Sequence, residues 1–215
     1  MTASLLPIFQ VGHLERVPLG TPYPGVVAHV GRLLGKLPAG TELVIDITGV
    51  GKPIFEMFTD AGISPVGVLI TAGTAETWHD WIWGVPKLTL VSRLQALLHQ
   101  GQLKILRELT EAETLVRELQ DFRFEFTAAG HVTFNARSGK HDDLVLALAI
   151  AVWRAYGGGM DAAFELMRRW ALGARANEPR YFIGLDLGQS RDPTAIAVVR
   201  RVEPPRPVPE NNFGL

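Results

Sequence analysis

Four aspartates stand in strongly apolar surroundings, in three separate segments of the chain. Asp186 lies in IGLDLG, Asp46 lies in LVIDITG, and Asp142 and Asp143 open the segment HDDLVLALAIAV. A carboxylate with such neighbours should lie at the edge of a buried element. There it needs a hydrogen-bond partner, a helix cap or a cation, because burying an unpaired charge is costly. Carboxylates from three segments that meet at one place repel each other unless a divalent ion lies between them.

Oxygen ligands of this kind favour Mg²⁺ or Mn²⁺. Two such ions about 4 Å apart can activate water and stabilise the leaving oxygen in phosphodiester hydrolysis. Each aspartate also has a purely structural interpretation. Asp142 could be a helix N-cap, and Asp46 and Asp186 could each cap the turn that follows. Both interpretations stay open for any single aspartate, whereas the occurrence of all of them on a strand–strand–helix pattern favours the metal site.

The elements that must position these aspartates follow from hydrophobic patterning. Residues 42–47 and 65–70 are short apolar runs typical of buried strands, and residues 53–62 between them have a helical pattern. Strand, helix and strand with short links indicate a parallel pair with a right-handed crossover. Residues 181–187 and 193–201 indicate two strands joined by a tight glycine turn. Asp46 and Asp186 are therefore expected on strands of one α/β sheet.

The rest of the chain divides into further predicted elements. HDDLVLALAIAV begins a helix that is apolar nearly all round, so it should be buried. Residues 74–86 are rich in tryptophan and predict an irregular aromatic loop. The other predictions are an extended segment at 6–17, helices at 25–36, 87–100, 111–120 and 160–172, a short extended stretch at 103–106, and a hairpin across 122–138.

Composition excludes several classes of protein. The 215 residues carry 21 Lys and Arg against 22 Asp and Glu, so nucleic-acid binding would need a local basic patch rather than a global positive field. The absence of cysteine excludes disulfides and thiolate metal sites. The longest pure apolar run, residues 144–152, is too short to cross a bilayer, and the first residues lack the pattern of a signal peptide. We expect a soluble protein with no membrane partner, located in the cytoplasm, which is the host cytoplasm if the protein is viral.

Several segments together resemble the nuclease domain of phage terminase large subunits. HDDLVLALA and DLGQSRDPTAI are the specific ones, and HLERVPLGTPYP, LVIDITGVGKP and VPKLTLVSRLQALL are weaker alone. The resemblance covers residues 6–155 and 180–203. It implies an RNase H/RuvC-like α/β fold with a mixed five-stranded sheet and helices on both faces. In that sheet, strands 193–201, 181–187 and 6–17 are antiparallel, with 42–47 and 65–70 added in parallel.

The resemblance also implies a set of site residues. In the family, an Asp on the first strand, an acid on the strand after the first helix and an Asp at the start of the last helix hold two Mg²⁺ or Mn²⁺ ions. The corresponding residues here are Asp186, Asp46 and the pair Asp142 and Asp143, of which Asp143 is favoured as the direct ligand. By the same resemblance, His141 and Asp192 match positions near the metals, where they could be outer ligands.

Basic residues near these acids could form a phosphate track for double-stranded DNA. Simple surface solubility is an equally good explanation for them. The residues concerned are Lys87, Arg93, Arg137 and Lys140.

The order of the segments departs from the family, because the hairpin that carries Asp186 comes first there and last here. We therefore expect a circularly permuted single domain over residues 1–203, in which residues 157–180 are a linker and helix joining the permuted segments. Residues 204–215 are expected to form a flexible tail. Alternatively, the terminal hairpin pairs with the sheet of another copy, which gives a strand-swapped dimer.

The expected function is a terminase-like, metal-dependent DNA endonuclease that acts in viral genome packaging or processing. TGVGKP superficially resembles a phosphate-binding loop, but Pro53 stands where a hydroxyl residue is needed, so the packaging ATPase is expected as a separate partner, as is a portal. Two alternatives remain. IGLDLGQS also resembles the first hairpin of the actin and sugar-kinase group of nucleotide-binding folds, and the chain could be a non-catalytic structural partner in packaging.

Overall fold

An eight-stranded mixed sheet forms the centre of the molecule. The computed structural model describes residues 6–49, 52–80, 82–126, 132–136, 142–159, 180–188 and 192–204. The strand order is β4-β5-β3-β2-β9-β10-β1-β6. The strands are β1 (Ile8–Val17), β2 (Glu42–Asp46), β3 (Val66–Thr71), β4 (Thr77–His79), β5 (Ile82–Pro86), β6 (Leu103–Ile105), β9 (Arg180–Asp186) and β10 (Thr194–Val202).

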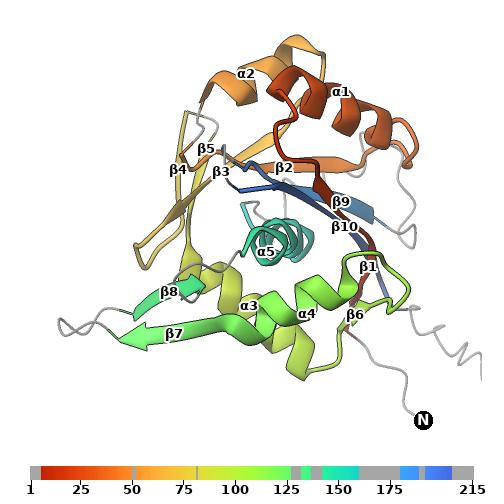
Figure 1. Ribbon diagram of the computed structural model, residues 1–215. Helices are drawn as coiled ribbons and strands as arrows, with labels where there is room; N and C mark the ends of the chain where they lie inside the picture. The colour runs from red at the N-terminus through yellow and green to blue at the C-terminus, as the bar shows by residue number, and fades with distance from the viewer. Residues whose placement is uncertain are drawn as a thin grey trace, which may run out of the picture.

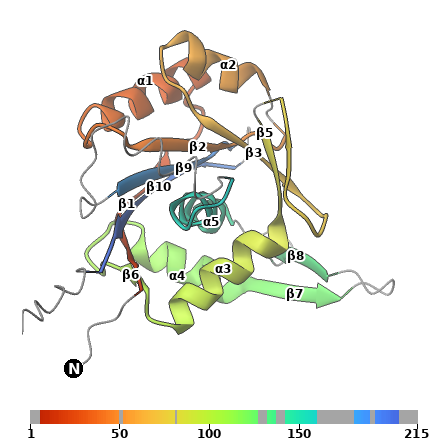
Figure 2. The same ribbon diagram turned by 180° about the vertical axis from the view of Figure 1, so that it is seen from behind.

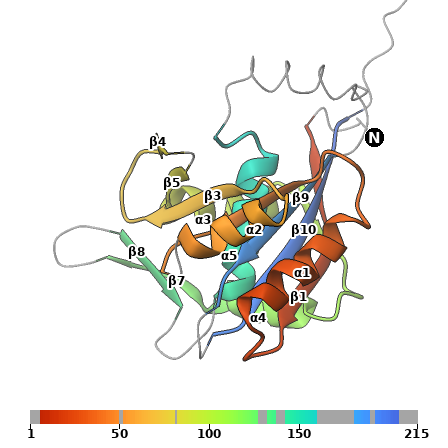
Figure 3. The same cartoon turned by 90° about the horizontal axis from the view of Figure 1, so that it is seen from above.

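The middle of this sheet is built from the last two strands of the chain. β10 pairs antiparallel with both β9 and β1, and β9 pairs in parallel with β2, which pairs in parallel with β3. The five predicted strands and their directions are thus confirmed, including the position of the C-terminal hairpin. Figure 3 shows the blue strands β9 and β10 beside β1, and the strand order places them between β1 and β2, which both come from the N-terminal part of the chain.

Three strands extend the sheet beyond the predicted five, and two of them correct the prediction of an irregular loop at residues 74–86. β4 and β5 pair antiparallel there, and β5 also pairs in parallel with β3. Aromatic and branched side chains at Ile82, Trp83 and Val85 favour a strand, and the edge of β3 offers them unpaired backbone groups. Gly84 permits the close approach of β4, since a Cβ atom there would lie 2.3 Å from Oγ1 of Thr77. β6 completes the other edge beside β1.

Helices cover both faces of the sheet, as predicted. In Figure 1, α1 and α2 lie on one face and α5 lies on the other, with α3 and α4 packed beyond α5. The same layers are seen from behind in Figure 2, where the separate hairpin of β7 and β8 extends beside α3 and α4. These elements are α1 (Tyr23–Leu34), α2 (Lys52–Asp60), α3 (Lys87–His99), α4 (Ala112–Asp121), β7 (Phe122–Phe126), β8 (Val132–Ala136) and α5 (Asp143–Ala155).

The helix α5 is buried between the sheet and the outer helices. Nearly every residue of α5 is buried, which confirms the prediction from its apolar sequence. It packs directly on β9 and β10, and small residues make this approach possible. A Cβ atom on Gly184 of β9 would lie 1.9 Å from the carbonyl oxygen of Ala147 in α5. The two backbones are therefore closer here than any larger side chain would allow.

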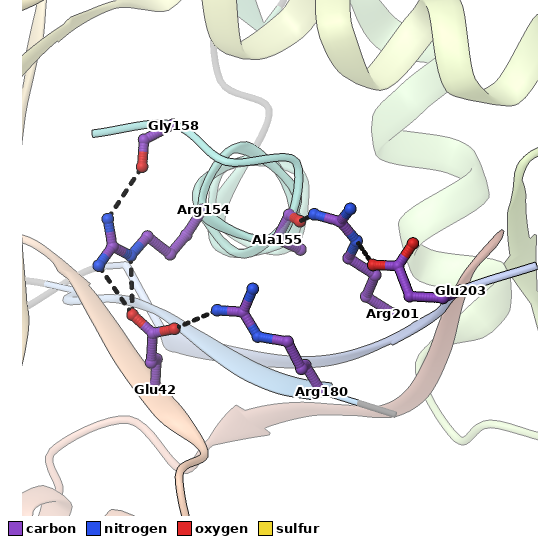
Figure 4. Close-up of polar contacts among 7 residues, drawn as sticks. All are labelled: Glu42, Arg154, Ala155, Gly158, Arg180, Arg201 and Glu203. Atoms are coloured by element: carbon purple, nitrogen blue, oxygen red, sulfur yellow. Dashed lines mark hydrogen bonds and ion pairs between the residues drawn. The ribbon is translucent and has the colours of Figure 1, made fainter. Parts of the chain in front are cut away.

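Ion pairs fix the beginning of β9 to α5 and β2. The carboxylate of Glu42 accepts hydrogen bonds from Nε of Arg154 at 2.9 Å and from Nη2 of Arg180, also at 2.9 Å (Figure 4). Arg154 is 7% exposed and also donates to the carbonyl oxygen of Gly158. The carboxylate of Glu42, which is 11% exposed, thus joins the start of β2, the start of β9 and the end of α5.

A second contact fixes the end of β10 to the same helix. Nη1 of Arg201 donates to the carbonyl oxygen of Ala155 at 2.7 Å, and Nε of Arg201 lies 2.7 Å from Oε1 of Glu203 (Figure 4). Both strands of the C-terminal hairpin are therefore linked to the C-terminal end of α5: β9 is linked through Glu42, and β10 is linked directly.

Some predictions concern residues that the structure does not describe. The helix predicted at 160–172 lies wholly among them, and so does the tail beyond residue 204. Within the described ranges, no helix is long and apolar enough to cross a membrane.

Candidate metal site

The parallel pairing of β2 and β9 places Asp46 and Asp186 opposite each other in register. Both residues are the last of their strands. Ile45 and Leu185, which precede them, belong to the hydrophobic core under α1 and α2. Because side chains alternate along a strand, Asp46 and Asp186 both face the other side of the sheet, where α5 lies. Asp46 is buried and Asp186 is half-buried.

The start of α5 brings two further carboxylates to the same place. Asp142 occupies the N-cap position of α5, and Asp143, which is buried, is its first residue. Burial raises the pKa of Asp186 well above its usual range, and the negative charges of Asp46, Asp143 and Asp142 raise it further. Carboxylates from β2, β9 and α5 therefore interact electrostatically, as the sequence predicts for one shared site. We call Asp46, Asp142, Asp143 and Asp186 the acidic cluster.

The electrostatics of Asp46 follow the same pattern. Burial raises the pKa of Asp46, and hydrogen bonds from the hydroxyl and backbone N–H of Thr48 oppose that rise. The positive charge of Lys87 lowers the pKa, whereas the charge of Asp142 raises it. A carboxyl group with a raised pKa in a group of like charges is a frequent feature of functional sites.

The capping roles that could explain these aspartates without a metal are found only in part. The backbone N–H of Thr48 donates to Oδ1 of Asp46 at 2.8 Å, so Asp46 does cap the turn after β2 with one oxygen. Asp142 occupies an N-cap position but makes no side-chain cap hydrogen bond. After β9, the N–H of Gly188 donates to Oγ1 of Thr194 rather than to Asp186. Helix capping therefore does not account for Asp142.

Lys87 lies within the acidic cluster. It is the first residue of α3, and its Nζ lies 3.0 Å from Oδ2 of Asp142. Its charge also lowers the pKa of Asp46 and of Asp186. The structure thus brings this predicted basic residue to the acids.

The other predicted residues have different positions. Asp192 is exposed and lies two residues before β10 begins. Arg93 is not at the acidic cluster: its guanidinium lies 4.8 Å from the ring centre of Tyr156, at the opposite end of α5. The remaining three predicted residues, Arg137, Lys140 and His141, lie outside the described residues.

Sequence reasoning missed Glu118, which touches the same helix end. Oε2 of this buried α4 residue accepts hydrogen bonds from the N–H groups of Leu144 and Val145, at 3.0 and 3.1 Å. Its other oxygen pairs with Arg16 of β1. A signal was present, because Glu118 follows the buried Leu115 by three residues and so occupies the apolar stripe of α4.

The donor set of the acidic cluster fits hard divalent cations. All four ligand candidates are carboxylates, the group that Mg²⁺ and Mn²⁺ prefer, and a divalent ion would relieve their mutual repulsion. Among the described residues, no group of three or more His, Cys, Asp or Glu side chains is placed so that it could hold a metal ion. The chemistry of the donors therefore supports the metal site, while the coordination itself stays a prediction.

The strand order and the helices on both faces agree with the predicted RNase H-like α/β fold. In sequence, the chain is similar to the large terminase subunits of Thermus phage G20c and Thermus virus P23-45, with 30% identity to each over 124 residues. These residues are 58% of this chain and 22% of each relative, so the chain matches about a fifth of the relatives' length. The predicted resemblance to phage terminase large subunits is thereby confirmed.

Among solved structures, the chain is similar to the large terminase nuclease of phage G20c with bound magnesium. That similarity has a TM-score of 0.48 and 24% identity, and covers 68% of this chain and 80% of the other. No protein-family model matches the chain.

Proposed function

We propose that this chain is a terminase-like DNA endonuclease that depends on Mg²⁺ or Mn²⁺. The observation that carries the proposal is the acidic cluster, in which Asp46 and Asp186 lie opposite each other in register and the charges of Asp46, Asp142 and Asp143 raise the pKa of Asp186. The sequence similarity to terminase large subunits supports a role in cutting DNA during viral genome packaging or processing. One solved relative binds magnesium, which agrees with the chemistry of this donor set.

Asp186, Asp46 and Asp143 would hold the metal ions, with Asp142 as a further ligand. Two divalent ions held there would supply an activated water and stabilise the leaving 3′ oxygen of the phosphodiester. The strands hold Asp46 and Asp186 in register, and Thr48 fixes the orientation of the Asp46 carboxylate through Oδ1. Backbone supports of this kind restrict the movement of the ligands, which metal-dependent catalysis requires.

Lys87 has a proposed role in meeting the DNA backbone. It is paired with Asp142 at the cluster, so its ammonium would lie beside a phosphate next to the cut. Contacts to phosphates position DNA without reading its sequence, so weak sequence specificity is expected. A packaging ATPase and a portal are the proposed protein partners.

We further propose that the connectivity is a circular permutation of the family's. The hairpin of β9 and β10 is last in the chain but lies at the centre of the sheet, between β2 and β1. The ends of neighbouring strands lie close together, so opening the chain between β10 and β1 is physically permissible.

The test is a nicking assay on supercoiled plasmid DNA with Mg²⁺ or Mn²⁺. Asp186→Ala, Asp46→Ala and Asp143→Ala should each reduce cleavage more than about 100-fold, beyond the loss typical of an outer-shell partner. EDTA should abolish the activity of the wild type. The mutant Asp60→Ala is the matched control, because Asp60 is an exposed aspartate at the end of α2, and it should cleave like the wild type.

Two outcomes contradict the proposal. The first is wild-type protein that leaves supercoiled DNA intact in both metals at low and moderate salt. The second is a triple mutant of Asp46, Asp143 and Asp186 that nicks as well as the wild type. Binding of nucleotide without any nicking would favour the actin and sugar-kinase alternative instead.

A further inference from the structure

The first turn of α5 is capped by a different helix. The first amide groups of a helix have no partner inside it, and a side chain at the N-cap position usually accepts from the second and third of them. In α5 these are the N–H groups of Leu144 and Val145, and both donate to Oε2 of Glu118 in α4. Asp142, the N-cap residue, makes no such bond and is paired with Lys87 instead.

The position of Glu118 is itself fixed. Its side chain is 6% exposed, and its other oxygen, Oε1, pairs with the guanidinium of Arg16 in β1. Both carboxylate oxygens are thus engaged, one by a strand and one by a helix end. Burial raises the pKa of Glu118 to about 7, while the Arg16 charge and the Val145 hydrogen bond oppose that rise.

This arrangement has a direct consequence for the acidic cluster. An aspartate at an N-cap position normally turns its carboxylate back onto its own helix. Here Glu118 accepts from those amides, and the carboxylate of Asp142 pairs with Lys87.

We propose that Glu118 is a positioning residue for the metal site: by capping α5 from α4, it holds in place the helix end that carries Asp142 and Asp143. Glu118 would touch neither metal nor DNA and would act through α5. The expected effect on metal binding rests on the proposed function, whereas the hydrogen bonds of the cap can be measured without metal.

The test combines amide hydrogen exchange by NMR, without metal, with Mn²⁺ titration by calorimetry. In Glu118→Ala, exchange at Leu144 and Val145 should accelerate about tenfold or more, since hydrogen bonds to a charged acceptor are lost. Mn²⁺ affinity should fall about 10- to 100-fold, as for other outer-shell supports. Glu118→Gln keeps an acceptor but not the charge, so its exchange should accelerate only about threefold, with an intermediate Mn²⁺ affinity.

Glu113→Gln is the matched control, because Glu113 is an exposed glutamate on the same helix, and it should match the wild type in both measurements. If Glu118→Ala does not fold, the proposal is tested by comparing Glu118→Gln with Glu113→Gln in amide exchange and in Mn²⁺ affinity. Unchanged exchange at Leu144 and Val145 overturns the cap. Faster exchange with unchanged Mn²⁺ affinity overturns the positioning role and leaves a structural cap only.

Failure of the proposed function has a distinct signature. Wild-type protein that binds no Mn²⁺ overturns both the metal site and the positioning role, even where the amides respond to substitution at Glu118.

Discussion

At the scale of single residues, the close approach of Gly184 to Ala147 near the acidic cluster leaves no space for a larger side chain at position 184. Gly184 lies on β9 two residues before Asp186, so its packing on α5 sets the distance between the strand and the helix that carry the acids. The carbonyl of Ala147 stands where any Cβ atom on residue 184 would project.

Gly184→Ala should therefore destabilise the protein by about 3 kcal/mol, at the upper end of the usual cost of overpacking, because backbone must move to accept the methyl group. Urea denaturation measures the change. Gly12→Ala is the matched control: this glycine is exposed on β1 with nothing within 4 Å of a Cβ atom, and its cost should stay below about 0.5 kcal/mol. Equal stabilities of the two variants would contradict the close approach.

Candidate site residues could be predicted from the sequence where an acidic residue interrupts an apolar run. Asp46, Asp142, Asp143 and Asp186 could be singled out because an acid in an apolar run is locally conspicuous. Glu118 is as buried as Asp46 and Asp143, but it stands in the polar-looking segment ETLVRELQD. Its partners Arg16 and Leu144 are distant in sequence, so only the packed structure brings them together.

At the scale of elements, the ion pairs around Glu42 decide how firmly the C-terminal hairpin is held. Glu42 binds two arginines from two different elements, and Arg154 is nearly inaccessible to water. A buried pair contributes little over an apolar replacement, but removing one partner leaves an uncompensated charge.

Glu42→Ala should consequently lower the free energy of unfolding by about 3 to 5 kcal/mol, because the guanidinium of Arg154 would be left buried without its carboxylate. Thermal or urea unfolding followed by circular dichroism gives the value. Glu203→Ala removes a more exposed carboxylate from the same end of α5 and should cost less than about 1 kcal/mol. A cost for Glu42→Ala no larger than that of the control would show that the buried network is dispensable.

The elements themselves were predictable where periodicity was strong. The sequence patterns of five elements indicate their secondary structure clearly, because each contains a continuous apolar run. These elements are α5, β2, β3, β9 and β10. β4 and β5 were not predicted, since a short stretch of aromatic residues becomes a strand only when the edge of β3 is available to pair with it. Pairing between distant segments is decided by tertiary context rather than by local preference.

At the scale of the whole molecule, the C-terminal hairpin joins two otherwise separate parts of the sheet. β4, β5, β3 and β2 lie on one side of it, and β1 and β6 lie on the other. In the described residues, no ladder joins β1 directly to β2. The hydrophobic cores on both faces of the sheet also include residues of β9 and β10, such as Phe182 and Ile183.

A chain that stops at residue 179 should therefore lose cooperative unfolding and bind hydrophobic dye, as expected for a partly packed state. Adding a synthetic peptide of residues 180–204 should restore a single transition, because the peptide can pair with β2 and β1 at once. A chain that stops at residue 204 is the control and should unfold like the full chain. A sharp two-state transition for the 1–179 chain would contradict the central role of the hairpin.

This position of the hairpin has a consequence for biosynthesis. A ribosome releases β1, β2 and α5 long before it releases β9, so the nascent chain carries Asp46, Asp142 and Asp143 without Asp186. The acidic cluster cannot be completed until the sheet closes around its last strands. If the chain is a nuclease, the order of its segments would delay the onset of DNA cleavage until translation has passed β10, without any inhibitor.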